Sequence, residues 1–128
     1  MSDMGFTPNL TATDAVYPFR FVEISGIFAG AHCQEPDAFP VGVSDGSVYQ
    51  FNQVVHAPIG YQITLQPSNT VQIQIGAGGI NVGQFIMSDG EGRGIAQTGA
   101  NSLSTYQALE SGTEGSIIRA FRIGSKKL

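Results

Sequence analysis

Alternation of apolar and polar residues is clearest over Tyr61–Ile75. Apolar residues occupy every second position from Tyr61 to Leu65 and again from Val71 to Ile75, and Gln or Thr fills the positions between them. A period of two is the period of a β-strand, and the intervening Pro67–Asn69 favours a turn. The pattern predicts a two-stranded hairpin with one apolar face on a core and one uncharged Gln/Thr face.

The rest of the chain is predicted to form more short strands separated by turns rich in Gly, Asp and Ser. The exception is Asn101–Leu109, where a short helix is an alternative to a strand. The predicted class is an all-β fold, a compact β-sandwich or small β-barrel of short antiparallel strands. The other expected strands are Phe19–Ser25, Ile27–Ala31 beyond a bulge at Gly26, Ala38–Val43, Val48–Phe51, Gln53–His56, Val82–Met87, Gly94–Thr98, Tyr106–Glu110 and Ser116–Ile123.

The first 18 residues differ from the rest, because they are polar with isolated apolar positions. We expect an extended N-terminal arm over 1–18 and a single β domain over 19–128. An isolated apolar side chain on an arm contributes little unless it enters a partner's pocket. Phe6, Leu10, Tyr17 and Phe19 are therefore predicted to be partner-interface anchors.

The composition supports a β-protein and adds an unusual surface. Ile and Val outnumber Leu by 21 to 5, and the 17 Gly suit turns. Charged residues make up 12% of the chain, about half the usual share, and none occurs between Asp45 and Asp89. Interface cores are depleted of charge, so we expect much of this exterior to be covered by protein, with Gln62, Gln72 and Gln74 in the interface.

Net charge and cysteine content exclude several classes. The formal charge of -4 argues against nucleic-acid binding, which needs a basic patch. The lone Cys33 can form neither an intrachain disulfide nor a structural zinc site. No apolar run is long enough for a transmembrane helix, and the first residues lack the pattern of a signal peptide, so we expect no membrane partner and synthesis in a cytoplasm.

Several motifs resemble catalytic or metal sites, and each has a simpler interpretation. Gly42–Gly46 matches G-x-S-x-G around Ser44, but a strand follows where a nucleophile elbow needs a helix. Adjacent His32 and Cys33 point to opposite faces of an extended chain, so His56 would have to be the base. A zinc site from these three residues with Glu35 or Asp37 lacks the usual ligand spacing.

Two glycine-rich segments complete the candidates. Gly76–Gly79 could cradle a phosphate but opens no helix, so a corner between strands is expected. Asp89, Glu91 and Arg93 lie in a hairpin loop without the alternating acidic pattern of a calcium loop. The sequence thus predicts no catalytic residue, no cofactor and no metal, and it predicts that the chain is not an enzyme.

The C-terminal third resembles bacteriophage head decoration proteins, also called capsid cement proteins. The resemblance covers about 45 residues from Ile80 onward, and Gly30–Ser47 is similar to the earlier half of that family. The Gln/Thr pattern at 61–75 and the low charge depart from the family. The matching segments are Val82–Ile86, Asp89–Gly92, Ile95–Gly99, Ala108–Glu110 and Gly115–Arg119, with Phe39–Val43 in the earlier half.

This resemblance implies a location and a set of partners. Proteins of the family form trimers on the outer capsid surface and bridge neighbouring major capsid proteins against internal pressure. The expectation for this chain is therefore a virion protein made in the host cytoplasm, self-associating as a homotrimer and bound to the major capsid protein.

Two rival classes remain open. The first is a carbohydrate- or host-receptor-binding β-module of a phage virion, for which the chain has no Trp and for which only Tyr17, Tyr49, Tyr61 and Tyr106 offer an aromatic platform. The second is a small hydrolase built on Ser44 or Cys33. A glycan array separates the first rival from a decoration protein, and alanine substitutions separate the second.

Overall fold

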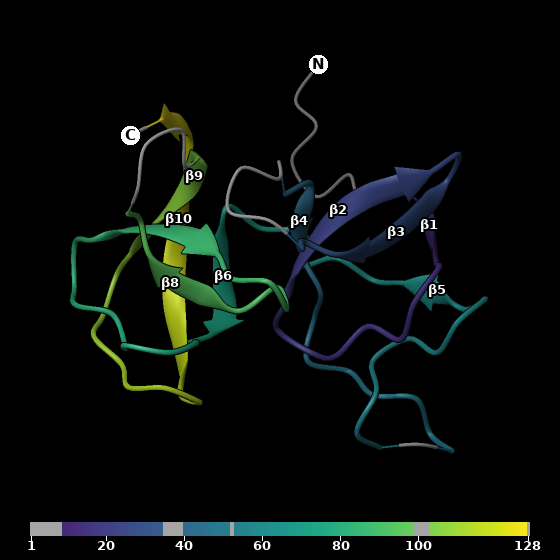
Figure 1. Cartoon of the computed structure of the whole chain (residues 1–128). Coiled ribbons are helices and arrows are strands. Elements are labelled where there is room, and N and C mark those ends of the chain that lie inside the picture. The colour runs from purple at the N-terminus through teal and green to yellow at the C-terminus, as the bar shows by residue number, and fades with distance from the viewer. Residues whose placement is uncertain (1–8, 35–39, 52, 99–102, 128) are drawn as a thin grey trace.

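The computed structural model describes residues 9–34, 40–51, 53–98 and 103–127. Within these ranges the chain forms ten strands and no helix, so the all-β prediction is confirmed. The strands make two five-stranded sheets. Figure 1 shows the two sheets side by side, with β2, β3 and β5 on the right and β6, β8 and β10 on the left.

The first sheet has the strand order β4-β2-β3-β1-β5 and closes on itself. β1 runs parallel to β3, and the other neighbours are antiparallel. A bridge between Ser44 and Leu65 joins the two outer strands, and the Asp45 N–H donates to the Thr64 carbonyl at 2.9 Å. The strands are β1 (Leu10–Ala12), β2 (Phe21–Gly26), β3 (Ala29–His32), β4 (Gly42–Val43) and β5 (Gln62–Ile63).

The second sheet has the strand order β6-β10-β9-β7-β8 and closes in the same way. A parallel bridge joins Ile75 to Gly94, and the Gly76 N–H donates to the Gly94 carbonyl at 2.8 Å. The fold is therefore of the small-barrel kind, in two units. The strands are β6 (Thr70–Gln74), β7 (Phe85–Ser88), β8 (Gly94–Ala96), β9 (Leu103–Ala108) and β10 (Ile117–Lys127).

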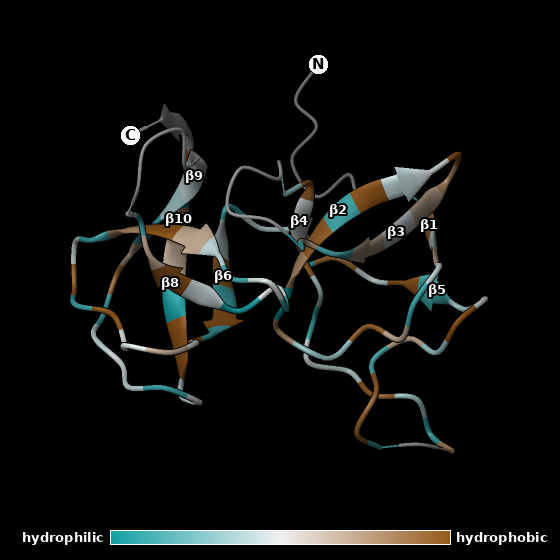
Figure 2. Ribbon diagram, in the orientation of Figure 1, coloured by the Kyte–Doolittle hydropathy of each residue, from teal (hydrophilic) through white to brown (hydrophobic). Residues whose placement is uncertain are grey.

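Each barrel has its own core, and β2 contributes to both. Val22 packs in the first barrel with Leu10, Ile63 and other buried residues. The preceding Phe21 points the opposite way, as strand geometry requires, and packs in the core of the second barrel, 5.4 Å from the Tyr106 ring. Figure 2 shows apolar segments on the strands of both barrels.

Hydrogen bonds from Arg20 join the two barrels beside this shared core. The Arg20 Nε donates to Gln74 Oε1 at 3.1 Å, and an Nη donates to the Glu91 carbonyl at 3.0 Å. The Phe21 N–H donates to the Gly92 carbonyl at 2.7 Å. The segment 19–21 of the first barrel is thus held by backbone and side chain against the second barrel.

The Tyr61–Ile75 hairpin is not formed, and that prediction was wrong. β5 pairs with β1 in the first barrel, whereas β6 pairs with β10 in the second. The turn at Pro67–Asn69 is the crossing between barrels. The two segments are joined here by a side chain and not by strand pairing. The Gln66 amide accepts the Gln72 N–H at 2.8 Å and donates to the Gln72 carbonyl at 2.7 Å.

The described part of the predicted arm belongs to the body. β1 is hydrogen-bonded between β3 and β5, and Leu10, Ala12 and Val16 are buried in the first core. The boundary at residue 18 is therefore not a structural boundary. Because β1 pairs with β3 and β5, its apolar residues are buried in the core of the first barrel and need no partner chain. Residues 1–8 lie outside the described residues.

Three further expectations differ in detail. The predicted strands Val48–Phe51 and Gln53–His56 lie in a loop, whose described residues make isolated bridges only. Ile27 and Phe28 do not continue a bulged strand but form the turn between β2 and β3. The open choice at Asn101–Leu109 is resolved in favour of a strand, β9, from Leu103 onward.

Gly92 tests the contact between the barrels. Its φ is +80°, and a Cβ there would lie 2.8 Å from the Phe21 carbonyl oxygen. Gly83 has a similar φ of +86°, but a Cβ at Gly83 would have no neighbouring atom within 4 Å. Each alanine substitution lowers the free energy of unfolding by about 1–2 kcal/mol, because a residue with a Cβ is strained at a left-handed φ. Only Gly92→Ala adds a clash with backbone.

We expect urea unfolding to show a loss of about 1 kcal/mol for Gly83→Ala and at least twice that for Gly92→Ala. Equal losses would mean that the Phe21–Gly92 contact does not hold the barrels together.

Candidate interaction surfaces

Ser44, the serine of the G-x-S-x-G match, is a buried structural residue. Its hydroxyl donates to the Tyr17 carbonyl at 2.7 Å and accepts the Arg20 N–H at 3.0 Å. The side chain is fully buried. The motif is therefore β4, the bridged Ser44 and the bend at Gly46, so the expected plain turn covers only its end, and Ser44 holds the Tyr17–Arg20 segment.

Asp45, Ser47 and His56 come together, but not in the order of a catalytic triad. His56 is buried; its Nδ1 lies 2.8 Å from the Ser47 carbonyl, and its Nε2 accepts the Thr64 N–H at 2.9 Å. The Ser47 hydroxyl faces Asp45. The His56 Nδ1 also lies 3.3 Å from the Ser47 hydroxyl and 3.3 Å from an Asp45 carboxylate oxygen. Serine and acid thus meet the same ring nitrogen, whereas a triad histidine places one nitrogen on the serine and the other on the acid. The cluster anchors the 46–56 loop to β5.

Cys33 and His32 do not form a reactive pair. Burial, and then the Glu23 charge, raise the pKa of the Cys33 thiol to about 12, so the thiolate that a nucleophile requires is absent at neutral pH. His32 faces the other way, where its Nε2 accepts the Tyr17 N–H at 2.9 Å. Burial, and then the Arg20 charge, lower the pKa of His32 to about 4.

Neither of the two acidic groupings considered in the sequence is arranged around a cation in the described residues. Among the described residues no three His, Cys, Asp or Glu side chains lie together as a metal site, and Glu35 and Asp37 fall outside those residues. Asp89 Oδ1 accepts the N–H groups of Glu91 and Arg93 at 2.8 and 2.9 Å, and Oδ2 pairs with the Arg93 Nε at 3.0 Å. The carboxylate thus shapes its own turn.

The predicted aromatic and leucine anchors are distributed differently from the expectation. Leu10 is only 3% exposed, so it cannot anchor a partner, because it fills the first core. Phe19 is half-buried, with a φ of +60° and its ring against Gly46. Tyr17 is partly exposed, and its ring stacks on His32 and beneath Arg20. Phe6 lies outside the described residues.

The three predicted glutamines do not form one ladder. Gln72 and Gln74 lie on β6, opposite Arg119 and Ile117 of β10 on the outside of the second barrel. Gln74 also accepts from Arg20, as described above. Gln62 lies on β5 of the first barrel, where its Nε2 donates to Asn9 Oδ1 at 2.8 Å. These residues belong to two separate surfaces, and their role in binding stays a prediction.

Several large apolar residues are exposed in the loop between β4 and β5, here called the aromatic loop (residues 46–61). Phe51 is 78% exposed and Val54 is 68% exposed. The Tyr49 ring contacts the rings of Phe51 and Tyr61, at 5.6 and 4.9 Å between centroids. Val48 and Ile59 are also exposed. Figure 1 places this loop at the lower right, away from the second barrel.

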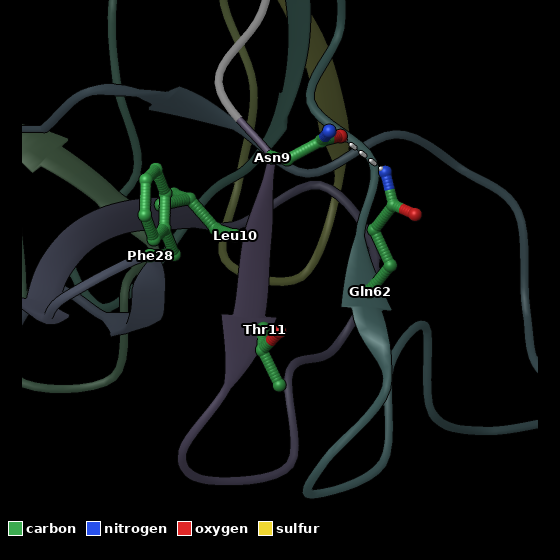
Figure 3. Close-up of a pocket in the computed structure, with 5 residues that line it drawn as sticks. All are labelled: Asn9, Leu10, Thr11, Phe28 and Gln62. Atoms are coloured by element: carbon green, nitrogen blue, oxygen red, sulfur yellow. Dashed lines mark hydrogen bonds between the residues drawn. The ribbon is translucent and has the colours of Figure 1, made fainter.

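A second exposed site surrounds the β2–β3 turn. Ile27 is 92% exposed and Phe28 is 76% exposed. Phe28 forms one wall of a pocket of about 400 Å³, whose other lining residues are Asn9, Leu10, Thr11 and Gln62. Figure 3 shows the ring of Phe28 on one side of β1 and the Asn9–Gln62 amide pair on the other. The sequence signal for this site is a pair of large apolar residues, Ile27 and Phe28, at a turn. The prediction of a strand over Ile27–Ala31 placed both residues in a sheet, so the site was missed.

Comparisons with known proteins support the architecture. No family model matches the sequence, and no curated protein matches it. The chain is similar in structure to the crystal structure of the N base of head fiber gp8.5 in bacteriophage phi29, with a TM-score of 0.71 and 18% identity over 94% of each chain. At this identity the likeness shows a shared fold.

None of the described residues forms a helix able to span a membrane.

Cys33 provides a test of the hydrolase alternative. Because its pKa is raised to about 12, we expect no reaction with a thiol reagent at pH 8 in the folded protein and stoichiometric reaction in urea. Rapid labelling of the folded protein, together with loss of a hydrolytic activity in Cys33→Ala, would contradict this account.

His32 predicts an acid-sensitive stability. Its pKa is lowered to about 4, so between pH 6.5 and 4 the unfolded state binds more protons, and the free energy of unfolding falls as the pH falls. His32→Gln retains an acceptor for the Tyr17 N–H without titrating. We expect urea unfolding to show a shallower acid decline for His32→Gln than for the wild type, and parallel declines would disprove the assignment.

Proposed function

We propose that the chain is a non-enzymatic structural protein of a phage head, which binds the outer capsid surface and bridges major capsid protein subunits. The observation that carries the proposal is the aromatic loop, which exposes large apolar side chains in a segment with no charged residue. The fold, shared with the N base of a phage head fiber over most of both chains, supports the same interpretation.

The aromatic loop has the character of a protein contact. Large exposed apolar patches on a soluble protein mark interaction sites, and interface cores are rich in Tyr and Phe and poor in charge. Phe51, Val54 and Tyr61 are all more than half exposed. The His56 Nδ1 contacts the Ser47 carbonyl within the loop, and its Nε2 accepts the N–H of Thr64 just after β5, so part of the ordering cost of binding is already met in the free protein.

Attachment of this kind stabilises a shell through linked equilibria. A protein that binds only the assembled head favours that state by mass action. In this proposal three copies bind as one unit, and their separate contacts add avidity. Gln72 and Gln74 lie on the outside of the second barrel, whereas the aromatic loop belongs to the first, and both remain candidates for contact between copies.

The runner-up is a carbohydrate- or host-receptor-binding module. The tyrosines that the sequence offered as a platform favour it little, because Tyr106 is buried and Tyr17 is stacked on His32. Tyr49 contacts the rings of both Phe51 and Tyr61, and the two tyrosine hydroxyls lie 3.3 Å apart. Such surroundings suit a protein surface better than a sugar.

The test uses heads of the phage that encodes the chain, assembled without it. We expect added protein to bind these heads and to raise their melting temperature. A Phe51→Ser, Val54→Ser double variant should bind at least about tenfold more weakly, because truncating interface anchors typically costs more than about 1 kcal/mol each. Val82→Ser with Leu109→Ser, which alters exposed apolar residues of the second barrel, is the matched control.

Cosedimentation with heads measures the affinities, and calorimetry measures the melting temperature. Absence of wild-type binding, or equal binding by the aromatic-loop variant, would refute the proposed attachment.

A further inference from the structure

The pocket beside the β2–β3 turn is distinct from the aromatic loop and has a different chemistry. Its floor is β1, whose backbone is already paired, since the Thr11 N–H donates to the Phe28 carbonyl at 2.8 Å and β5 pairs on the other side. A peptide therefore cannot add to this site as a further strand, and recognition must come from side chains. Besides the buried Leu10, those side chains are one phenyl ring, two amides and one hydroxyl.

The polar groups of the pocket can both donate and accept. The hydrogen bond from Gln62 Nε2 to Asn9 Oδ1 orients the two amides. That bond uses one donor and one acceptor, so the Asn9 amide nitrogen and the Gln62 amide oxygen still offer a donor and an acceptor. Thr11 adds a hydroxyl, which does both. None of the lining residues is charged, so the pocket does not select an anion or a cation.

The apolar wall is held at a cost in backbone strain. Phe28 has a φ of +51°, a conformation that a bulky residue rarely adopts because it strains the backbone. Gly would adopt it freely. The strain nevertheless positions an aromatic ring that is largely exposed, so burial in the folded chain does not explain why this position carries Phe.

We propose that this pocket binds an uncharged sugar unit of a glycan. A pyranose ring has an apolar face that stacks on an aromatic ring, and hydroxyls that donate and accept hydrogen bonds; the Phe28 ring and the Asn9, Thr11 and Gln62 side chains supply matching groups. A pocket of about 400 Å³ lies at the lower end of the range for small-ligand sites. This activity is additional to head attachment and uses different residues.

The test is a glycan array with the full chain, followed by saturation-transfer NMR on the best neutral oligosaccharide. We expect neutral glycans to bind and saturation to pass most strongly to the protons on the apolar face of one sugar ring, an effect that Phe28→Gly should remove. Phe28→Gly removes the ring and relieves the strain, so it should bind about tenfold or more weakly with a melting temperature no lower than that of the wild type. Gln62→Ala should also weaken binding.

Matched controls come from the second barrel. Phe121→Gly and Gln72→Ala remove an exposed phenyl ring and an exposed amide there, and both should bind the glycan as the wild type does. No binding to any neutral glycan, or unchanged binding by Phe28→Gly, would overturn the proposal. Loss of head binding in Phe28→Gly without any glycan binding would overturn it too, because the pocket would then be a protein contact; head attachment itself would stand.

Discussion

Phe21 and Val22 are consecutive residues of β2, and each is buried in a different core. This double burial is the constraint on which the rest of the structure depends. Each barrel is built from about half of the chain, a size at which a core alone gives only marginal stability, and the chain has no disulfide to compensate. The cores are therefore stabilised together, through Phe21 on Tyr106 and through the hydrogen bonds of Arg20 and Gly92.

The sequence predicted local structure well and pairing poorly. Period-two alternation identified β2 and β6, and Gly-rich turns bounded β7, β8 and β10, because these signals act within a few residues. Alternation could not show that β5 and β6 belong to different barrels, since the same pattern serves a hairpin and a crossing. It also could not show that Leu10 is buried, because that depends on pairing with Ile63 more than fifty residues away.

The candidate sites follow the same division. Spacing and context argued correctly that no helix follows Ser44 and that Gly76–Gly79 is a turn between strands, because catalytic motifs require a specific local fold. Of the two exposed surfaces, only the apolar pair at the β2–β3 turn had a local signal, since exposure otherwise depends on how the barrels assemble. Phe51 and Val54 have the local pattern of strand residues, and only the closure of the first barrel between Ser44 and Leu65 leaves their loop outside the core.

The low content of charged residues is explained by this arrangement of the two barrels and the aromatic loop. One side of the first barrel is covered by the second barrel, and the aromatic loop extends on another side, uncharged and rich in aromatic residues. Hydrogen–deuterium exchange of the chain, free and bound to phage heads, tests this most directly. The account predicts slower exchange on the heads across residues 48–61, whereas unchanged exchange there in a head-bound chain would contradict it.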